Sequence, residues 1–272
     1  MERILFFGPH GSNTQIAAEK LVDANCLEAV SSIRTIIELI AQNLCVAGVV
    51  PIENSIEGTV RETIDCLIRT KDKSVQIIKE IVLPIEHCLI TKATDFAQIK
   101  KIYSHPQALA QCNGFINKNF PTAEVIAAPN TAEAVKIISQ KDESFAAIAN
   151  KKAAELYGVP VLAQKISDEA DNQTRFVLIG RGESLKTGKD KSSFVFTTIN
   201  KPGALADAMM VFKKYNINLS HIDSRPSKKQ FGAYSFFIEC DAHIEDESLK
   251  SAIEEIEPLT SFIRFLGAYP RF

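Results

Sequence analysis

Apolar residues in the first two-thirds of the chain follow two alternating patterns. Short continuous runs, such as those at 4–8 and 46–50, have the length of buried strands. Between them, apolar residues recur at helical spacing, as in the isoleucine-rich segment 33–44, and Ser12 with Gln15 forms a capping box at one helix start. Strands alternating with helices predict an α/β fold with largely parallel sheets.

The same two patterns predict the remaining elements of this region. Helices are expected after Thr59, His105, Asn130 and Lys151. Further strands are expected at 75–83, 87–91, 101–104, 125–128, 145–149, 161–166 and 175–179.

The pattern changes after residue 180. Residues 181–192 are polar, charged and without a period, which is typical of a linker. We therefore predict a first domain over 1–180, a linker over 181–192 and a second domain over 193–272. The second domain is expected to have the order βαββαβ, which is the ferredoxin-like pattern, with strands at 194–199, 217–223, 232–240 and 262–266 and helices at 204–215 and 247–255.

Composition and charge exclude several classes of protein. The 272 residues are 46% hydrophobic and carry a net charge of −2, which provides no electrostatic basis for binding nucleic acid. The longest apolar runs are too short to span a bilayer, and strand-like sequence from Arg3 onward leaves no room for a signal peptide. We expect a cytoplasmic protein with neither a nucleic-acid nor a membrane partner.

The six cysteines are scattered along the chain. They form no C-x-x-C pair and have no histidine at metal-ligand spacing. We interpret them as small core residues in a reducing compartment, and we expect no disulfide framework, no metal and no cofactor.

Candidate chemistry gathers in polar loops at the ends of predicted strands. Such loops lie at 8–12, 51–58, 104–107 and 172–176, and open α/β sheets place ligands at strand ends. The glycine-flanked turn at 8–12 precedes a capped helix, so its backbone N–H groups suit an anion such as a carboxylate. Each loop taken alone also has a purely structural explanation. In chain order these are a turn, an Asn-containing loop, a histidine at a helix start and an ion pair at a sheet edge.

Taken together, these loops resemble the signature segments of the prephenate dehydratases, in the order of that family. The resemblance extends over essentially the whole chain and includes 130–134 and 153–158. Its main motifs are Gly8-Pro9-x-Gly11-Ser12, Val50-Pro51-Ile52-Glu53-Asn54-Ser55, Ser104-His105-Pro106-Gln107-Ala108-Leu109-Ala110-Gln111-Cys112 and Asn172-x-Thr174-Arg175-Phe176.

The resemblance implies two α/β lobes like those of a periplasmic binding protein, with the active site in the cleft between them. It also implies that Thr174 is the catalytic hydroxyl. Prephenate as substrate has two carboxylates, and chemical fit assigns the pyruvyl carboxylate to Arg175 or to the helix start after Gly11, while a poorly solvated wall at Phe176 would favour loss of the ring carboxylate. The predicted substrate-binding residues are Ser12, Asn54, Ser55, Gln107, Arg175 and Phe176.

In the second domain, Pro202-Gly203-Ala204-Leu205 and Ser224-Arg225-Pro226 resemble the ligand-binding motifs of the ACT domain. The resemblance implies L-phenylalanine as allosteric effector, bound between ACT domains of two subunits, and hence a homodimer or homotetramer. Taken without the resemblance, the glycine would serve only a tight turn and the arginine only a solvated surface. The predicted effector contacts are Gly203, Ala204, Leu205, Asn218, Asp223, Ser224, Arg225 and Pro226.

The sequence departs from the family pattern at two positions. Asn13 stands where relatives usually carry an aromatic residue, and Asp223 replaces the commoner glutamate. No chorismate mutase segment precedes Met1, so we expect a monofunctional enzyme. Two alternatives stay open, namely an arogenate dehydratase, whose substrate carries an amine in place of the ketone, and a non-enzymatic amino-acid sensor.

Overall fold

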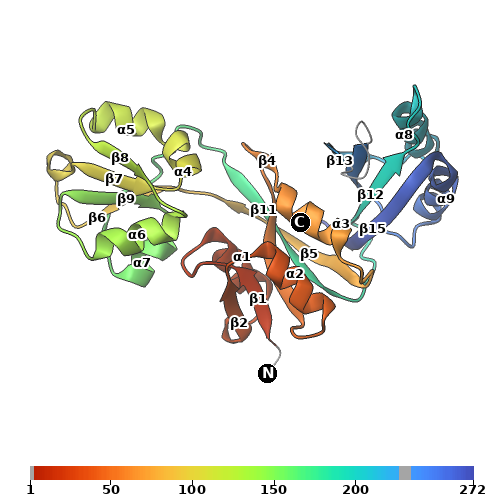
Figure 1. Cartoon of the computed structure of the whole chain (residues 1–272), viewed down its shortest axis with the longest axis horizontal. Helices are drawn as coiled ribbons and strands as arrows, with labels where there is room; N and C mark the ends of the chain where they lie inside the picture. Colours follow the sequence, from red (N-terminus) through yellow and green to blue (C-terminus); the bar gives the residue numbers. More distant parts are fainter. Residues whose placement is uncertain (1–2, 227–233) are drawn as a thin grey trace.

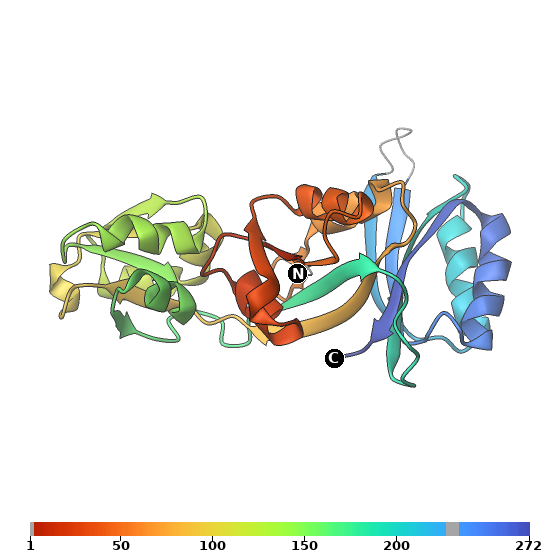
Figure 2. The same ribbon diagram turned by 90° about the horizontal axis from the view of Figure 1, so that it is seen from below.

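Three sheets organise the chain, and each forms the centre of one body (Figure 1). The structure, a computed structural model, describes residues 3–226 and 234–272. Two views at right angles show the bodies in a row, with the N-terminal body in the middle (Figure 2). We call them the first lobe, the second lobe and the C-terminal domain.

The first lobe is built on a six-stranded sheet with the order β2-β1-β3-β11-β5, to which β4 is added beside β3. Apolar faces of its helices cover the sheet, as where α2 packs Ile36 and Ile40 against the strands. Its strands are β1 (Ile4–Phe7), β2 (Leu27–Val30), β3 (Ala47–Asn54), β4 (Gly58–Thr59), β5 (Val75–Pro84) and β11 (Gln173–Arg181), and its helices are α1 (Asn13–Leu21), α2 (Ile33–Ala41) and α3 (Arg61–Arg69).

The second lobe has a five-stranded sheet with the order β10-β6-β9-β7-β8. Small residues such as Ala147 and Ala149 line the central strand and let α6 pack closely on it. Its strands are β6 (Cys88–Thr91), β7 (Lys101–Ser104), β8 (Glu124–Ala127), β9 (Phe145–Ala149) and β10 (Val161–Ala163), and its helices are α4 (Pro106–Gln111), α5 (Asn113–Asn119), α6 (Thr131–Ser139) and α7 (Lys151–Tyr157).

The chain passes between the lobes twice, once from β5 to β6 and once from β10 to β11. The two passages are hydrogen-bonded to each other, since Ile85 N donates to Asn172 O at 2.8 Å. On its return the chain enters the first sheet as β11, antiparallel to both β3 and β5. Both lobes therefore hold mixed sheets, and the prediction of largely parallel sheets is wrong, because it could not anticipate the direction of a strand that arrives from the other lobe.

The C-terminal domain is an antiparallel sheet with the order β13-β14-β12-β15 and two helices on one face. This arrangement confirms the predicted βαββαβ order. The part of the predicted third strand before Tyr234 lies outside the described residues. The elements are β12 (Asp190–Thr198), α8 (Ala204–Lys214), β13 (Leu219–Pro226), β14 (Tyr234–Cys240), α9 (Glu247–Ile256) and β15 (Thr260–Pro270).

One hydrophobic core joins the first lobe to the open face of the C-terminal sheet. Ile77 and Val177 of the first lobe share a buried cluster with Phe237, Leu266 and Tyr269 of the C-terminal domain. Because the side chains interlock across the boundary, the two bodies bury apolar surface against each other as parts of one core do.

The linker is shorter than predicted. Strand β11 continues to Arg181, and β12 already begins at Asp190. Lys191 is buried and its ammonium lies 3.1 Å from the Glu80 carboxylate. A polar, charged stretch can thus belong to a buried ion pair, which composition alone does not distinguish from a solvated linker.

The contact between β15 and β5 depends on the absence of a side chain at Gly267. This glycine has φ of +140°, and an added Cβ would overlap the backbone carbonyl of Ile77. We predict that Gly267→Ala lowers the free energy of unfolding by about 3 kcal/mol, because both backbone strain and a backbone clash must be relieved. Gly188→Ala, at φ of +88° with no atom within 4 Å of the added Cβ, should cost only about 1 kcal/mol. Equal melting temperatures for the two variants would contradict this packing.

Candidate active site

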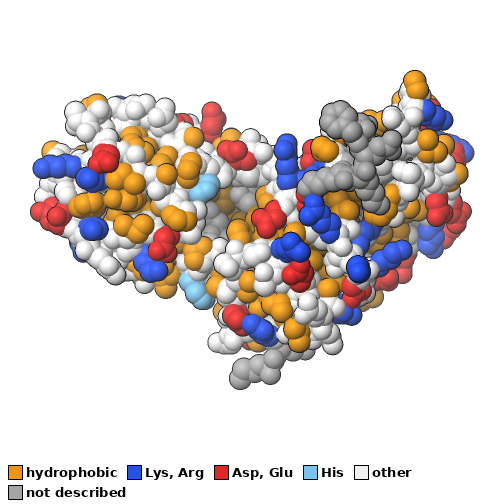
Figure 3. All heavy atoms as spheres, in the orientation of Figure 1, with side chains coloured by type: hydrophobic (Ala, Val, Ile, Leu, Met, Phe, Trp, Pro, Cys, Tyr) orange, Lys and Arg blue, Asp and Glu red, His pale blue; other side chains and the backbone are white. Residues whose placement is uncertain are grey.

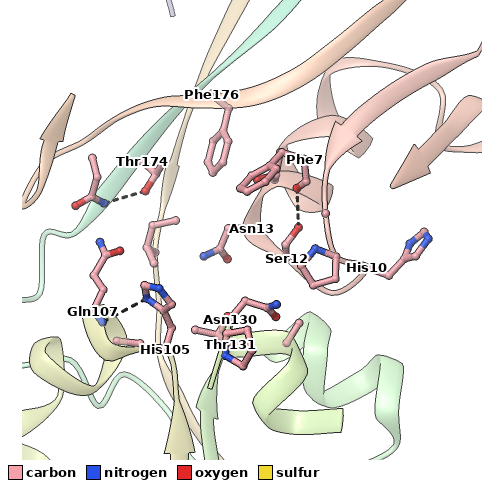
Figure 4. A pocket seen from close by; sticks show the side chains of 18 of the residues that line it. Phe7, His10, Ser12, Asn13, His105, Gln107, Asn130, Thr131, Thr174 and Phe176 are labelled. Atoms are coloured by element: carbon pink, nitrogen blue, oxygen red, sulfur yellow. Dashed lines mark hydrogen bonds between the residues drawn. The ribbon is translucent and has the colours of Figure 1, made fainter. Parts of the chain in front are cut away.

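A cavity of about 690 Å³ lies between the two lobes. The first lobe contributes the β1–α1 loop and the ends of β2, β3 and β11, and the second lobe contributes the starts of α4 and α6 (Figure 4). The space-filling view shows histidine side chains beside the junction of the two lobes (Figure 3). Strand ends from one lobe thus face helix starts from the other.

Thr174 and Phe176 point into this cavity from β11 (Figure 4). The Thr174 hydroxyl oxygen accepts a hydrogen bond of 2.9 Å from the Asn54 side-chain amide. The amide orientation of Asn54 is fixed, because its Oδ1 accepts from the backbone N–H groups of Ile56 and Glu57 at 3.0 Å each. With a lone pair of Oγ1 engaged, the hydroxyl hydrogen of Thr174 can be directed at a ligand.

A chain of polar side chains continues from Asn54 across the passages between the lobes. Asn54 Nδ2 donates to Asn172 Oδ1 at 2.8 Å, and Asn172 Nδ2 donates to Gln111 Oε1 at 3.0 Å. His87 Nε2 lies 3.0 Å from the same Gln111 oxygen. Since His87 and Asn172 belong to the two passages, this network ties the floor of the cleft to the joint between the lobes.

Two buried polar atoms of this network have no hydrogen-bond partner among the described residues, namely His87 Nδ1 and Gln111 Nε2. Burial lowers the pKa of His87, opposed in part by its bond to Gln111, so the imidazole is neutral near pH 7. A buried amide without a hydrogen-bond partner costs free energy unless a ligand accepts its hydrogen bond. Both His87 and Gln111 line the cavity, where a ligand could do so. Neither His87 nor Gln111 was predicted from the sequence as a site residue.

Three helices begin at the cavity wall and direct the positive ends of their dipoles toward it. Their capping residues are Ser12 for α1, His105 for α4 and Asn130 for α6. All three line the cavity. The N-terminus of a helix offers backbone N–H groups that can bind an anion, although the helix end itself carries no full charge.

No lysine, arginine, aspartate or glutamate of the described chain lines the cavity. Over the described ranges 3–226 and 234–272, no group of three or more His, Cys, Asp or Glu side chains could hold a metal ion. An anionic ligand would be held by helix starts, amides and hydroxyls rather than by countercharges.

Sequence comparison identifies the family of this chain. Residues 4–184 match the family model of prephenate dehydratase, and residues 193–258 match that of the ACT domain. The chain belongs to the prephenate dehydratase family. One relative in this family is the prephenate dehydratase of Methanocaldococcus jannaschii, which is 40% identical in sequence. The alignment covers 99% of this chain and 98% of that protein.

Other members of the family are larger or are known as crystal structures. The bifunctional chorismate mutase/prephenate dehydratase of Aquifex aeolicus is 37% identical over 99% of this chain and 74% of its own length. The crystal structure of the prephenate dehydratase of Arthrobacter aurescens in complex with L-Phe superimposes with a TM-score of 0.90 at 31% identity, covering 99% of this chain and 90% of that one. The two-lobed fold with a C-terminal ACT domain is thus the fold of solved prephenate dehydratases.

Most of the predicted substrate-binding residues meet in the cleft. Ser55 does not line the cavity; its hydroxyl lies 2.9 Å from Gln173 N and 3.4 Å from Asp171 O, so it fastens the second interlobe passage to the end of β3. The predicted residues that line the cavity are Ser12, Asn54, Gln107, Thr174 and Phe176.

Arg175 also lies outside the cleft. Because successive residues of a strand face opposite sides, Arg175 turns away from Thr174 and Phe176 and toward the ACT sheet. Its guanidinium is buried and bonded to Glu239 at 2.8 and 2.9 Å and to Glu80 at 2.9 Å. The assignment of a substrate carboxylate to Arg175 does not fit this geometry, and the helix starts are left for that task.

Asn13, the departure from the family pattern, also lines the cavity. Its Oδ1 accepts a hydrogen bond of 2.8 Å from the side chain of Asn150, the N-cap of α7 in the second lobe, which also donates to Gly11 O at 3.0 Å. The polar residue at position 13 thus forms an interlobe bond that an aromatic side chain could not form.

The predicted effector residues divide into two groups. A hollow of about 220 Å³ contains Gly203, Ala204 and Leu205, at the start of α8, together with Tyr234 and Phe236 of β14. Gly203 has φ of +81° and an added Cβ would meet no atom within 4 Å, so the backbone is open to a ligand there.

The second group belongs to or precedes edge strand β13 and is already engaged in part. Asn218 donates to Asp241 at 2.7 Å. Arg225 is buried and donates to Asp65 at 2.6 Å and to Arg61 O at 3.0 Å in the first lobe, so it fastens the domains together. Ser224 and Pro226 lie beside Asp223 on β13, whose outer edge has no neighbouring strand among the described residues.

Glu53 and His221 form a second cross-domain pair behind the cleft. His221 Nδ1 lies 3.2 Å from Glu53 Oε1. The hydrogen bond with His221 outweighs burial and, with Arg175, lowers the pKa of Glu53 to about 2. The same bond with Glu53 raises the pKa of His221 above its ordinary 6.5, against the effect of burial.

These shifts predict a window of pH in which the pair is most stabilising. The Glu53 contribution is present above its ordinary pKa of 4.5 and is lost as the pH falls toward 2, whereas the His221 contribution is present below 6.5 and is lost as the pH rises through the raised value. The melting temperature of wild type should therefore exceed that of Glu53→Gln by most between pH about 4.5 and about 6.5. The exposed Glu143→Gln should follow wild type at every pH, and a flat difference for Glu53→Gln would contradict the pairing.

Proposed function

We propose that this protein converts prephenate to phenylpyruvate, CO2 and water in the interlobe cleft, with Thr174 as the catalytic hydroxyl. The observation that carries the proposal is the hydrogen bond from Asn54 to Thr174 Oγ1, which engages a lone pair and frees the hydroxyl hydrogen. Family membership supplies the reaction. The cleft supports it by its chemistry.

In the reaction, prephenate loses its ring carboxylate as CO2 and its ring hydroxyl as water. The C–C bond to the ring carboxylate breaks, its electron pair completes the aromatic ring, and the ring hydroxyl leaves and takes up a proton from solvent to become water. A threonine is too weak an acid to release a free proton, so Thr174 would act by donating a hydrogen bond to the departing oxygen. The pyruvyl carboxylate would be held by the helix start after Gly11 and by donors such as Gln107.

The absence of fixed charge in the described lining favours this reaction. A ring carboxylate paired with Lys or Arg would be stabilised before its loss, whereas a cavity wall such as Phe176 leaves it poorly solvated. The lining also distinguishes the alternative substrate. Arogenate carries an ammonium group, and the described lining has no carboxylate to meet it.

We further propose that L-phenylalanine is the allosteric effector, bound at the start of α8. The relative from Arthrobacter aurescens, solved in complex with L-Phe, supports this, as does the open backbone at Gly203. A homodimer or homotetramer would place edge strand β13, with Asp223 and Ser224, against a second ACT domain. All six cysteines are free, which suits a cytoplasmic protein. No helix in the described chain has the length and apolarity needed to cross a bilayer.

The test is the rate of phenylpyruvate formation from prephenate. Thr174→Ala should lower kcat by about 10²- to 10⁴-fold while KM changes little, and Thr174→Ser should retain most of the activity because it keeps the hydroxyl. Ser55→Ala, which removes a hydroxyl outside the cavity, is the matched control and should retain kcat. L-Phenylalanine should suppress the wild-type rate.

Three results would contradict the proposal in different ways. An inert wild type that converts arogenate instead would overturn the substrate. A protein that binds phenylalanine but converts neither compound would be a sensor. A fully active Thr174→Ala would remove the catalytic role of that hydroxyl.

A further inference from the structure

The strands that carry Asn54 and Thr174 have their opposite faces against the ACT sheet. On the antiparallel strands β3 and β11, Asn54 pairs with Thr174, and the adjacent residues, Glu53 and Arg175, pair with each other. The first pair faces the cleft. The second pair faces the ACT domain, because a strand alternates its side chains.

The ACT domain meets this rear face through a buried cluster of charges. Glu239 of β14 binds Arg175 through both carboxylate oxygens, and its side chain is only 1% exposed. Lys191 of β12 lies 3.1 Å from Glu80 and 3.6 Å from Glu239. In this cluster the two cations balance the two most deeply buried carboxylates, and Arg175 Nε also donates to Glu53 at 3.1 Å, which links Glu53 to the margin of the cluster.

Glu53 has its own partner on the ACT domain. His221 of β13 places Nδ1 3.2 Å from Glu53 Oε1 and Nε2 3.2 Å from the hydroxyl of Thr59 on β4. The ring is packed against Phe237, with 5.5 Å between ring centroids. His221 thus grips the β3–β4 hairpin, whose turn contains the backbone N–H groups that hold Asn54.

His221 also lies two residues before Asp223, in the strand that carries the second predicted effector motif. A displacement of β13 would act on His221, then on Glu53 and on the adjacent Asn54, and so on the 2.9 Å bond to Thr174. This route consists of two side-chain contacts and the peptide link between Glu53 and Asn54. By comparison, Arg225 of the same strand reaches α3, which contributes no residue to the cavity.

We propose that His221 is a positioning residue that transmits the state of the effector strand β13 to Asn54 and Thr174 through Glu53. The inference rests on the proposed function, since it assigns the physical route of regulation between the two proposed sites. Asn54 and Thr174 line the cavity, whereas His221 lies outside it and acts through its contacts with Glu53 and Thr59.

The test measures coupling rather than activity alone. The ratio of the phenylalanine dissociation constants with and without a saturating non-reactive prephenate analogue defines a coupling factor, and the same factor must govern the effect of phenylalanine on binding of the analogue. For wild type we expect a factor in the usual range of about 5 to 150. His221→Ala should bring it close to 1 while phenylalanine still binds.

Two further variants separate coupling from general damage. His221→Gln keeps a donor that can reach Glu53 and should give an intermediate factor; if His221→Ala does not fold, a factor for His221→Gln below that of wild type is the expected result. His243→Ala removes the other histidine of the ACT domain, which bonds to Ser184 and Glu245 rather than to β3, and should keep the wild-type factor.

The outcomes distinguish this inference from the proposed function. A wild type that does not turn over prephenate refutes the proposed function itself. An active, phenylalanine-inhibited wild type whose factor is unchanged in His221→Ala and His221→Gln refutes only the route. Loss of phenylalanine binding in His221→Ala also refutes it, because His221 would then belong to the effector site.

Discussion

Because a β-strand directs successive side chains to opposite faces, β11 serves two sites at once. Thr174 and Phe176 reach the cleft, and Arg175 between them reaches the ACT sheet. Neighbouring β3 does the same with Asn54 and Glu53. The side that lines the cleft and the side that contacts the ACT domain are therefore two sides of one sheet, and neither side can shift without moving the backbone of the other.

The buried charges explain why the ACT domain has one defined position on the first lobe. Removing one partner of such a cluster leaves an uncompensated buried charge, which costs about 3–5 kcal/mol. Around the cluster lies the shared apolar core of Ile77, Phe237 and Leu266. Burial of apolar surface holds the two domains together, while Arg175 and Glu239 fix the position of the ACT sheet on the first lobe. A displaced sheet would leave both charges buried and unpaired.

Much of the fold followed from local patterns, but long-range direction did not. Capping residues and apolar runs predicted most elements and the βαββαβ order, whereas β2 (Leu27–Val30) was not predicted, as a short and only partly buried strand has a weak signal. In the site, motif position predicted that Thr174 and Gln107 would lie in the cleft. The prediction placed Arg175 in the cleft, which is wrong. The alternation of a strand shows that Arg175 faces the opposite side from Thr174 and Phe176, but not which of the two sides lines the cleft. Gln111 lies in the family-like segment 104–112 but was not predicted as a site residue, and its unpaired buried amide is what points to the cavity.

The central claim is that the cleft holds prephenate with its ring hydroxyl against Thr174. A crystal structure of the protein with a non-aromatisable analogue of prephenate tests it most directly. The account predicts the analogue between the lobes, with its hydroxyl within hydrogen-bond distance of Thr174 Oγ1 and a carboxylate at the start of α1 or α6. An analogue bound outside the cleft, or one whose hydroxyl faces a group other than Thr174, would contradict it.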